Sequence, residues 1–355
     1  MDERGRFHGC LLGGAVGDAL GAPIEFFSLA EIHRRLGPAG VTDYLPAYGR
    51  RGAITDDTQM TLFTAEGLLR ADNRWREKGI VDRVAMLHRA YLRWLNTQGG
   101  RPPARAAPDD GWLYGLPELH SPRSPGNTCL SALRSGRIGT LDAPINDSKG
   151  CGGVMRAAPA GLAHADPTAA FALGCDLAAI THGHIDGVLP AGFLAALITV
   201  LSRGESLAAA TSTARALLQA TARHGGTLAA VDAALALAER NAAPAADLAE
   251  SLGTGWTGDE ALAIGLYCAL VARDFAHGVL LAVNHGGDSD STGSIAGTIL
   301  GAALGVGAIP EAWLAGLELR EAIEQVAADL WRHFASGVPL DVAEREADWR
   351  RYPGS

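Results

Sequence analysis

Helical periodicity runs through most of this chain and limits what it can fold into. Segments 207–223, 228–242 and 261–275 place Ala, Leu and Val at intervals of three and four residues, over lengths well beyond an average strand. Runs of alternating Val, Ile and Thr, which are typical of strands, are nearly absent. The short apolar run at 278–283 fits either element, and its helical surroundings favour a helix. We therefore expect an all-α fold.

The loops between these segments do not divide the chain into separate units. Pro and Gly cluster at 37–51, 101–126 and 251–259, but none of these stretches resembles a low-complexity linker, and no repeat of fixed period occurs. The expected organisation is one compact helical domain over residues 1–355. Many of the 45 glycines fall within apparently helical segments, where each costs about 1 kcal/mol relative to Ala. This indicates close helix approach or backbone near a ligand, unless composition alone has drifted.

Charge and cysteine usage exclude several classes of protein. Thirty Lys and Arg against 39 Asp and Glu give a net charge of −9, the wrong sign for a protein that mainly wraps nucleic acid. The five cysteines form no CxxC pair for zinc or redox chemistry, so we expect reduced thiols and a cytoplasmic location. The N-terminus has no apolar leader core. The apolar stretches 189–201 and 295–309 fit buried helices better than membrane spans.

Two short acidic segments carry most of the chemical information. The first, Thr55-Asp56-Asp57-Thr58, directly precedes apolar residues at helical spacing, which places it at a helix N-terminus. One Thr or Asp there is the usual cap and complements the helix dipole. Capping needs one such residue, whereas three consecutive oxygen-bearing side chains are present, so a plain cap and a ligand cluster both remain open.

The second segment, Gly286-Gly287-Asp288-Ser289-Asp290-Ser291-Thr292-Gly293, runs into an apolar helix expected at 295–304. Two carboxylates two residues apart, interleaved with hydroxyls, can direct several hard oxygens to one point, as Mg²⁺, Mn²⁺ or Ca²⁺ requires. Burying unpaired carboxylates in a Gly- and Ala-rich setting is costly unless a cation or a proton neutralises them. The pattern favours a cation site over the alternative of two solvated caps.

Three familiar motifs in and near these segments match only in part. An EF-hand loop counted from Asp288 needs a Glu at its twelfth position, which is Ile299. Asp288, Asp290 and Thr292 fit the DxDxT pattern of phosphatases with an aspartyl nucleophile, but that pattern follows a buried strand near the start of an α/β fold. A phosphatase remains an alternative. The GxGxxG match at 253–258 follows no strand and is weak.

At these residues the sequence resembles the ADP-ribosylglycohydrolase family, and the resemblance spans nearly the whole chain. Six motifs occur in the family's order: 9–21 with Glu25, 55–58, 149–156, 181–182, 259–262 and 284–291. The resemblance implies an all-α orthogonal helical bundle with a binuclear Mg²⁺ or Mn²⁺ centre. It also implies hydrolysis of an ADP-ribosyl bond at the C1″ carbon of the distal ribose.

The metal ligands that the resemblance implies are oxygen donors from three segments: Glu25, Thr55, Asp56, Asp57, Asp288, Asp290 and Ser291. Residues 55–57 would hold one ion, Asp288 and Glu25 the other, and Asp290 would bridge them. Five carboxylates against two divalent cations leave a near-neutral centre, which can orient a ribose diol and activate water. Asp57 and Glu25 are the candidates for general acid or base.

A glycine-rich motif and its flanks supply the implied substrate contacts: Lys149, Gly150, Cys151, Gly152, Gly153, Val154, Met155 and Arg156. Glycine lets the backbone approach phosphate oxygens, and Lys149 and Arg156 could add positive charge for a pyrophosphate. A structural turn is the alternative. The family pattern also makes His182 a substrate contact. Gly126, Asn127 and Thr128, in a Pro-rich loop, are candidate contacts with the ribose or the adenosine. Relatives often have Asn in place of Cys151 and Thr in place of Ser291.

The sequence thus predicts a cytoplasmic hydrolase that uses two Mg²⁺ or Mn²⁺ ions to cleave the glycosidic bond between ADP-ribose and an acceptor. Its partner would be an ADP-ribosylated protein or small molecule, linked through arginine, serine or another group. A non-catalytic ADP-ribose-binding or structural relative is the rival. Such a relative should have lost one of the aspartates at 56, 57, 288 and 290, and all four are present.

Overall fold

The computed structural model describes residues 2–100, 110–240, 248, 251–339 and 341–354, and it is all-α as the sequence predicts. Its helices are α1 (Glu3–Gly21), α2 (Leu29–Leu36), α3 (Asp56–Lys78), α4 (Arg83–Thr97), α5 (Asn127–Arg134), α6 (Ala158–Leu162), α7 (Pro167–Ala179), α8 (Ile185–Ser202), α9 (Leu207–Gln219), α10 (Gly225–Glu239), α12 (Gly258–Leu270), α13 (Phe275–Val283), α14 (Ser289–Leu304), α15 (Glu311–Gly316), α16 (Arg320–Phe334) and α17 (Val342–Arg351).

Short 3₁₀ turns join some of these helices: η1 (Ala22–Ile24), η2 (Leu113–Gly115), η3 (Pro117–Leu119), η4 (Cys151–Gly153) and η5 (Val306–Ala308). One small sheet occurs in the described part of the chain, where β1 (Pro46–Ala47) pairs antiparallel with β2 (Arg50–Arg51). This hairpin lies within a segment expected to be loop.

The periodic segments form helices close to the expected bounds. Segment 207–223 contains α9, and 228–242 overlaps α10, with 241–242 outside the described residues. The helix expected over 261–275 was wrong at its end: α12 stops at Leu270, and Asp274 caps a new helix by accepting a hydrogen bond from His277 N at 2.7 Å. The ambiguous run at 278–283 lies within α13, which confirms the helical interpretation.

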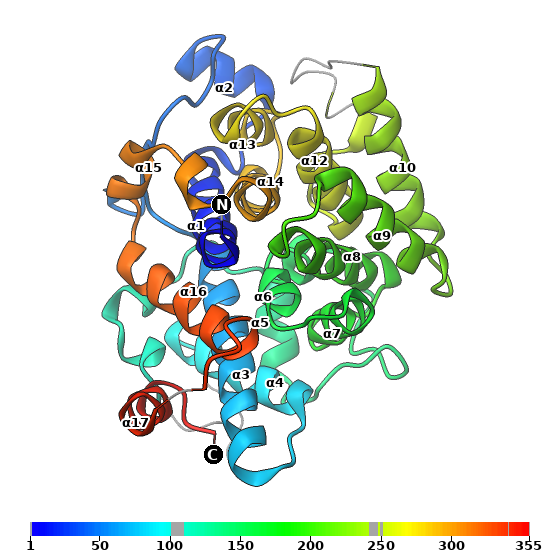
Figure 1. Cartoon of the computed structure of the whole chain (residues 1–355). Helices are drawn as coiled ribbons and strands as arrows, with labels where there is room; N and C mark the ends of the chain where they lie inside the picture. Colours follow the sequence, from blue (N-terminus) through cyan, green and yellow to red (C-terminus); the bar gives the residue numbers. More distant parts are fainter. Residues whose placement is uncertain (1, 101–109, 241–247, 249–250, 340, 355) are drawn as a thin grey trace.

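Helices α1 and α14 lie side by side at the centre of the molecule (Figure 1). Glycines four residues apart on each helix make the contact: Gly9, Gly13 and Gly17 of α1, and Gly293, Gly297 and Gly301 of α14. A Cβ at any of these positions would lie less than 3.0 Å from backbone of the opposite helix. For these six glycines, close helix approach is therefore the explanation among the three that the sequence left open. The antiparallel contact ends with Gly21 beside Ser289, so the end of α1 meets the start of α14.

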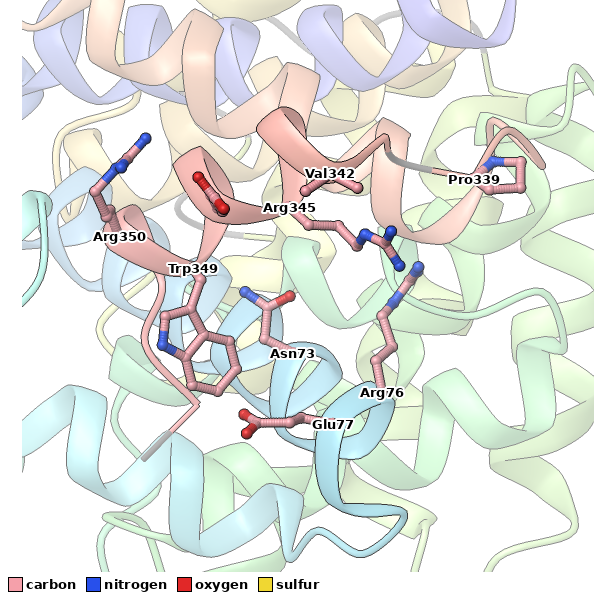
Figure 2. A pocket seen from close by; sticks show the side chains of 9 residues that line it. Asn73, Arg76, Glu77, Pro339, Val342, Arg345, Trp349 and Arg350 are labelled. Carbon is pink, nitrogen blue, oxygen red and sulfur yellow. The ribbon is translucent and has the colours of Figure 1, made fainter.

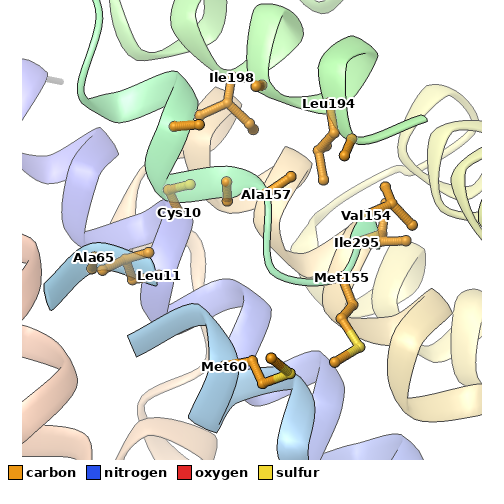
Figure 3. Packing of buried hydrophobic residues seen from close by; sticks show 14 of the residues in the cluster. Cys10, Leu11, Met60, Ala65, Val154, Met155, Ala157, Leu194, Ile198 and Ile295 are labelled. Atoms are coloured by element: carbon orange, nitrogen blue, oxygen red, sulfur yellow. The ribbon is translucent and has the colours of Figure 1, made fainter. Parts of the chain in front are cut away.

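Apolar side chains from distant parts of the sequence pack around this pair. Figure 3 shows Leu11 of α1, Met60 of α3 and Leu194 of α8 in one cluster with the 154–157 segment. Helix α8 is long and apolar enough to cross a membrane, and α1 with η1 and α2 passes the same test only as a pair bent by 85°. Because 89% of the apolar window of α8 is buried inside the molecule, it is explained as a core helix.

Buried charges in the middle of α3 are paired with basic side chains. Glu66 Oε1 lies 3.0 Å from Arg70, and Glu66 Oε2 lies 2.9 Å from Arg93 of α4. All three side chains are at most 2% exposed. The chain therefore neutralises this carboxylate internally.

A second charged group fastens the C-terminal helices to α3. His333 of α16 lies between two carboxylates, 2.7 Å from Asp72 of α3 and 3.0 Å from Asp348 of α17. Asn73 adds a hydrogen bond to Asp348 at 2.8 Å. The end of α3 is thus joined to both α16 and α17 by polar contacts.

Candidate metal centre and substrate pocket

Acidic side chains from opposite ends of the chain line one pocket of about 190 Å³: Glu25, Asp56, Asp57, Asp288 and Asp290. None is more than 8% exposed. Asp56 and Asp57 lie in the first turn of α3. Asp288 occupies the N-cap position of α14 without a capping hydrogen bond from its side chain, and Asp290 lies in the first turn of α14. Glu25 follows η1, directly after α1. The close contact of α1 with α14 therefore carries Glu25 to the acids of α14.

Asp18 of α1 supports this cluster, although it was not among the site residues predicted from the sequence. Its carboxylate accepts hydrogen bonds from Thr55 N at 3.0 Å and Thr58 N at 3.1 Å, and another from the Thr58 hydroxyl. Asp18 thus caps the N-terminus of α3 from a neighbouring helix. The only signal in the sequence is its place in the glycine-rich motif 9–21.

Burial raises the pKa of every carboxyl that lines the pocket, and repulsion from Asp290 raises the pKa of the other four further. Burial, followed by the charge of Asp290, raises the pKa of Glu25 to about 9 and that of Asp18 to about 7. The same two causes raise the pKa of Asp288 and of both acids of α3, and burial raises the pKa of Asp290 itself. The fully ionised cluster is therefore unfavourable unless positive charge compensates it.

The donor set fits a hard divalent cation. Buried carboxylate oxygens without a hydrogen-bond partner occur on four of the acids: Glu25 Oε2, Asp57 Oδ2, Asp288 Oδ2 and Asp290 Oδ1. Buried polar atoms are normally paired, and carboxylate and hydroxyl oxygens are the ligands that Mg²⁺ and Mn²⁺ prefer. Among the described residues, no group of three or more His, Cys, Asp or Glu side chains is arranged as it would be around a metal ion.

A glycine-rich turn forms another wall of the pocket. Gly150, Cys151 and Gly152 line it, and Cys151 begins the 3₁₀ turn η4. The Ser291 hydroxyl donates a hydrogen bond to Cys151 Sγ at 3.6 Å, and Cys151 N donates one to the Trp256 carbonyl at 3.3 Å. The backbone of this turn therefore lies beside the acidic cluster, where glycine allows close approach of a phosphate.

His182 lines the pocket next to this turn and is neutral. Burial, with Arg156 nearby, lowers the pKa of His182 to about 3, and Nδ1 is paired with the Thr181 hydroxyl at 2.9 Å. A Cβ at Gly152 would lie 3.0 Å from His182 Cε1. A neutral imidazole here can hydrogen-bond to a substrate oxygen without adding charge.

The predicted substrate contacts fall into two groups. Those that line the pocket are Gly126, Asn127, Thr128, Gly150, Cys151, Gly152, Met155 and His182. Those that do not line it are Lys149, Gly153, Val154 and Arg156. The implied metal ligand Thr55 does not line the pocket either. Thr55 is fully buried, and its hydroxyl accepts a hydrogen bond from Asp57 N at 3.2 Å.

Arg156 does not place its positive charge in the pocket, where a pyrophosphate was expected to bind. The guanidinium is fully buried and donates to the Leu177 carbonyl at 2.9 Å and the Thr181 hydroxyl at 2.7 Å. It also stacks over the Tyr91 ring, 4.3 Å from the centroid. Arg156 therefore stabilises the core under the glycine-rich turn.

An aromatic rim at the pocket was missed by the sequence analysis. Trp256 lines the pocket and stacks on Phe26, with ring centroids 5.7 Å apart and exposures of 42% and 69%. Glu260 fixes the loop that carries Trp256, because its carboxylate accepts hydrogen bonds from Thr254 N at 3.2 Å and Gly255 N at 3.1 Å. The 259–262 motif signalled this region, but spacing alone does not reveal the contact.

A larger cavity of about 870 Å³ lies elsewhere, between α3 and α17. Figure 2 shows Asn73, Arg76 and Glu77 of α3 facing Arg345 and Trp349 of α17. Its lining includes both basic and acidic side chains, and it shares no lining residue with the acidic pocket. Chemistry rather than size therefore identifies the smaller pocket as the candidate active site.

Comparisons with known proteins agree on one family. Residues 1–338 match the model of the ADP-ribosylglycohydrolase family. An uncharacterized protein of Archaeoglobus fulgidus is 30% identical over 93% of this chain and 97% of its own. The ADP-ribosyl-[dinitrogen reductase] glycohydrolase of Rhodospirillum rubrum is 29% identical over 88% and 90%, and ADP-ribosylhydrolase ARH3 of Bos taurus is 25% identical over 94% of each.

A solved structure described as an ADP-ribosylglycohydrolase-related protein complex superposes with a TM-score of 0.68 at 28% identity, covering 94% of this chain and 99% of that one. Fold and relatives together define the class as an all-α hydrolase of ADP-ribose linkages. The chain belongs to the ADP-ribosylglycohydrolase family. The DxDxT phosphatase alternative is wrong, because Asp288 lies in an all-α bundle, where it follows helix α13 and a turn rather than a strand.

Proposed function

We propose that this protein is a metal-dependent hydrolase that cleaves the glycosidic bond between ADP-ribose and an acceptor group and releases ADP-ribose. One observation carries the proposal: buried carboxylates from both ends of the chain line one small pocket, and four of them keep an oxygen without a partner. Two Mg²⁺ or Mn²⁺ ions would be held by Glu25, Asp56, Asp57, Asp288, Asp290 and Ser291, with Thr55 as the implied ligand from beneath.

The ions, when bound, would supply Lewis-acid stabilisation for a ribose diol and an activated water. The chain itself supplies proton transfer and charge: Asp57 and Glu25 each present an unpaired oxygen to the pocket and can take a proton from water or give one to the leaving group. Carboxylates also stabilise the cation-like ribosyl centre through which glycosides hydrolyse.

Substrate binding is assigned to the other walls. Backbone of the glycine-rich turn at 150–152 would receive the phosphates, and neutral His182 would hydrogen-bond to a substrate oxygen. The exposed faces of Trp256 and Phe26 offer apolar surface to a flat part of the substrate. With Arg156 turned into the core, positive charge at the pocket would come from the bound ions.

The test is release of free ADP-ribose from three substrates: ADP-ribosylated arginine, ADP-ribosylated serine and O-acetyl-ADP-ribose. We expect release from at least one with Mg²⁺ or Mn²⁺ present, and loss of that release with chelator. Calorimetric titration with ADP-ribose distinguishes the rival, because binding without release from any substrate would make this a non-catalytic ADP-ribose-binding protein.

A further inference from the structure

Two hydroxyl side chains form a hydrogen bond at the edge of the pocket, close to Glu25. Tyr48 Oη and Ser124 Oγ are 2.6 Å apart, and Ser124 lines the pocket together with Glu25. Burial and the charge of Asp290 raise the pKa of Glu25, and the nearby Ser124 hydroxyl lowers it. Neither hydroxyl was singled out by the sequence analysis.

Both residues hold a backbone conformation that is uncommon for their type. Tyr48 has a φ of 50° in the tight turn between β1 and β2, where Gly49 has a φ of 83°, and Ser124 has a φ of 54° just before Pro125. The left-handed region costs a non-glycine residue roughly 1–2 kcal/mol. Such conformations cluster at functional sites, and here two of them meet in one hydrogen bond beside the acidic cluster.

Arg123 contacts the Tyr48 ring and fixes the segment that carries Ser124. Its guanidinium lies 4.9 Å from the centroid of the Tyr48 ring and pairs with the buried Glu318 at 3.1 Å. Its backbone carbonyl accepts a hydrogen bond from Asp56 N at 2.9 Å, and Gly126 N donates to Asp56 Oδ2 at 3.3 Å. Segment 123–126 is therefore fixed to the start of α3, at the proposed metal centre.

We infer that Tyr48 and Ser124 are positioning residues for Glu25, an inference that rests on the proposed function of Glu25 at the metal centre. A tyrosine hydroxyl that donates to Ser124 Oγ leaves the serine proton for the Glu25 carboxylate. The chain then directs this carboxylate while Glu25 Oε2, which has no partner, stays available to the pocket. Because neither hydroxyl binds substrate in this role, their loss should lower kcat and spare KM.

Single hydroxyl deletions test this role. Tyr48→Phe and Ser124→Ala should each lower kcat for ADP-ribose release about tenfold, with KM changed by less than about twofold. Ser124→Thr should keep most of the rate, because it keeps the hydroxyl. The double variant should be no slower than Ser124→Ala, since Tyr48 acts through Ser124. Tyr114→Phe is the matched control: it removes a tyrosine hydroxyl that accepts from Asn96 at 2.8 Å outside the pocket, and kcat should not change.

Mn²⁺ affinity, measured by electron paramagnetic resonance, gives a readout that needs no substrate. We expect Tyr48→Phe and Ser124→Ala to weaken Mn²⁺ binding about tenfold and Tyr114→Phe to leave it unchanged. Additive effects of the two deletions, or a change confined to KM, would overturn the inference. If the wild-type protein releases no ADP-ribose, Mn²⁺ affinity decides alone, and equal affinities in all variants overturn it. A wild-type protein with neither release nor Mn²⁺ binding would remove the proposed function and this inference together.

Discussion

Helix α3 buries acidic side chains in two contrasting settings. At its first turn, Asp56 and Asp57 face other carboxylates, and no ion pair with a basic side chain joins them in the described part of the chain. Farther along, Glu66 lies between two arginines, and Asp72 meets His333. Where the chain supplies its own counter-charge, a buried acid serves stability, and where it does not, the acid is left to act on something outside the chain.

Asp290→Ala should have the largest effect of these variants, and it acts on the acidic cluster that has no basic partner among the described residues. We expect turnover to fall by at least about 10³-fold, because the proposed bridging oxygen is lost, while helical circular dichroism stays intact. Since the Asp290 charge raises the pKa of Glu25 and Asp288, its removal should also raise the melting temperature of the metal-free protein. Retained turnover in this variant would remove the bridging role.

Glu66→Ala tests the paired region and should have the opposite profile. It leaves Arg70 and Arg93 buried without their partner, which should lower the free energy of unfolding by about 4 kcal/mol in urea titrations. Turnover per folded molecule should be unchanged. Glu77→Ala, which removes an exposed carboxylate of the same helix paired with Lys78, is the control and should change stability by less than about 0.5 kcal/mol. Equal losses in the two variants would contradict the internal pairing argument.

Chelation should destabilise the protein only through the carboxylates of the acidic pocket, because these are the proposed metal ligands. At a metal concentration 100 times Kd, bound ion contributes about 2.7 kcal/mol to stability, so chelator should lower the melting temperature and Mg²⁺ or Mn²⁺ should restore it.

Burial and Asp290 raise the pKa of Glu25 from an ordinary value of about 4.3 to about 9. Glu25 in the folded metal-free protein therefore holds its proton over a range where it is ionised in the unfolded chain. The contribution of Glu25 to stability is complete below about pH 4.3 and is lost as pH rises toward about 9.

The stabilisation by metal should accordingly grow with pH, and it should be small in Asp290→Ala. Differential scanning calorimetry at several pH values, with and without chelator, measures both. Superimposable melting curves with and without chelator would count against a metal centre.

His333→Gln should give the smallest of these effects, about 2 kcal/mol of stability, because it removes a charged donor from two carboxylates. Burial lowers the pKa of His333, but hydrogen bonds to Asp348 and Asp72 outweigh it and the net shift is upward. The contribution of the imidazolium is therefore complete below its unfolded pKa of about 6.5 and is lost as pH rises through the higher folded pKa. With Mg²⁺ present, urea titrations at several pH values should show that His333→Gln lacks this loss of stability with rising pH. His33→Gln, which changes an exposed histidine of α2, should keep it.

The acidic site could be predicted from the sequence to the extent that it depends on local structure. Asp56, Asp57, Asp288 and Asp290 each stand at a helix start that spacing reveals, and their number exceeds what capping needs. The helical glycines indicated close packing as one of three explanations, and the choice among them needed the partner helix. Confinement to one domain and a cytoplasmic location stay predictions.

What escaped prediction depends on contacts between segments far apart in the chain. Asp18 caps a helix that is not its own, and Ser124 reaches Tyr48 through a turn with no periodic signal. Arg156 follows a glycine-rich turn, as a phosphate-binding cation would, but the turn directs its side chain inward. A residue's type and spacing are local quantities, whereas the direction it faces is set by the neighbours that folding brings to it.

The glycine contact between α1 and α14 has a consequence for how the gene can vary. Every missense change at a glycine codon introduces at least a β-carbon, and at these positions that atom would fall within backbone of the facing helix. A saturation library should therefore show positions that tolerate no substitution at every fourth codon in two separate stretches, 9–17 and 293–301, whose glycines face one another.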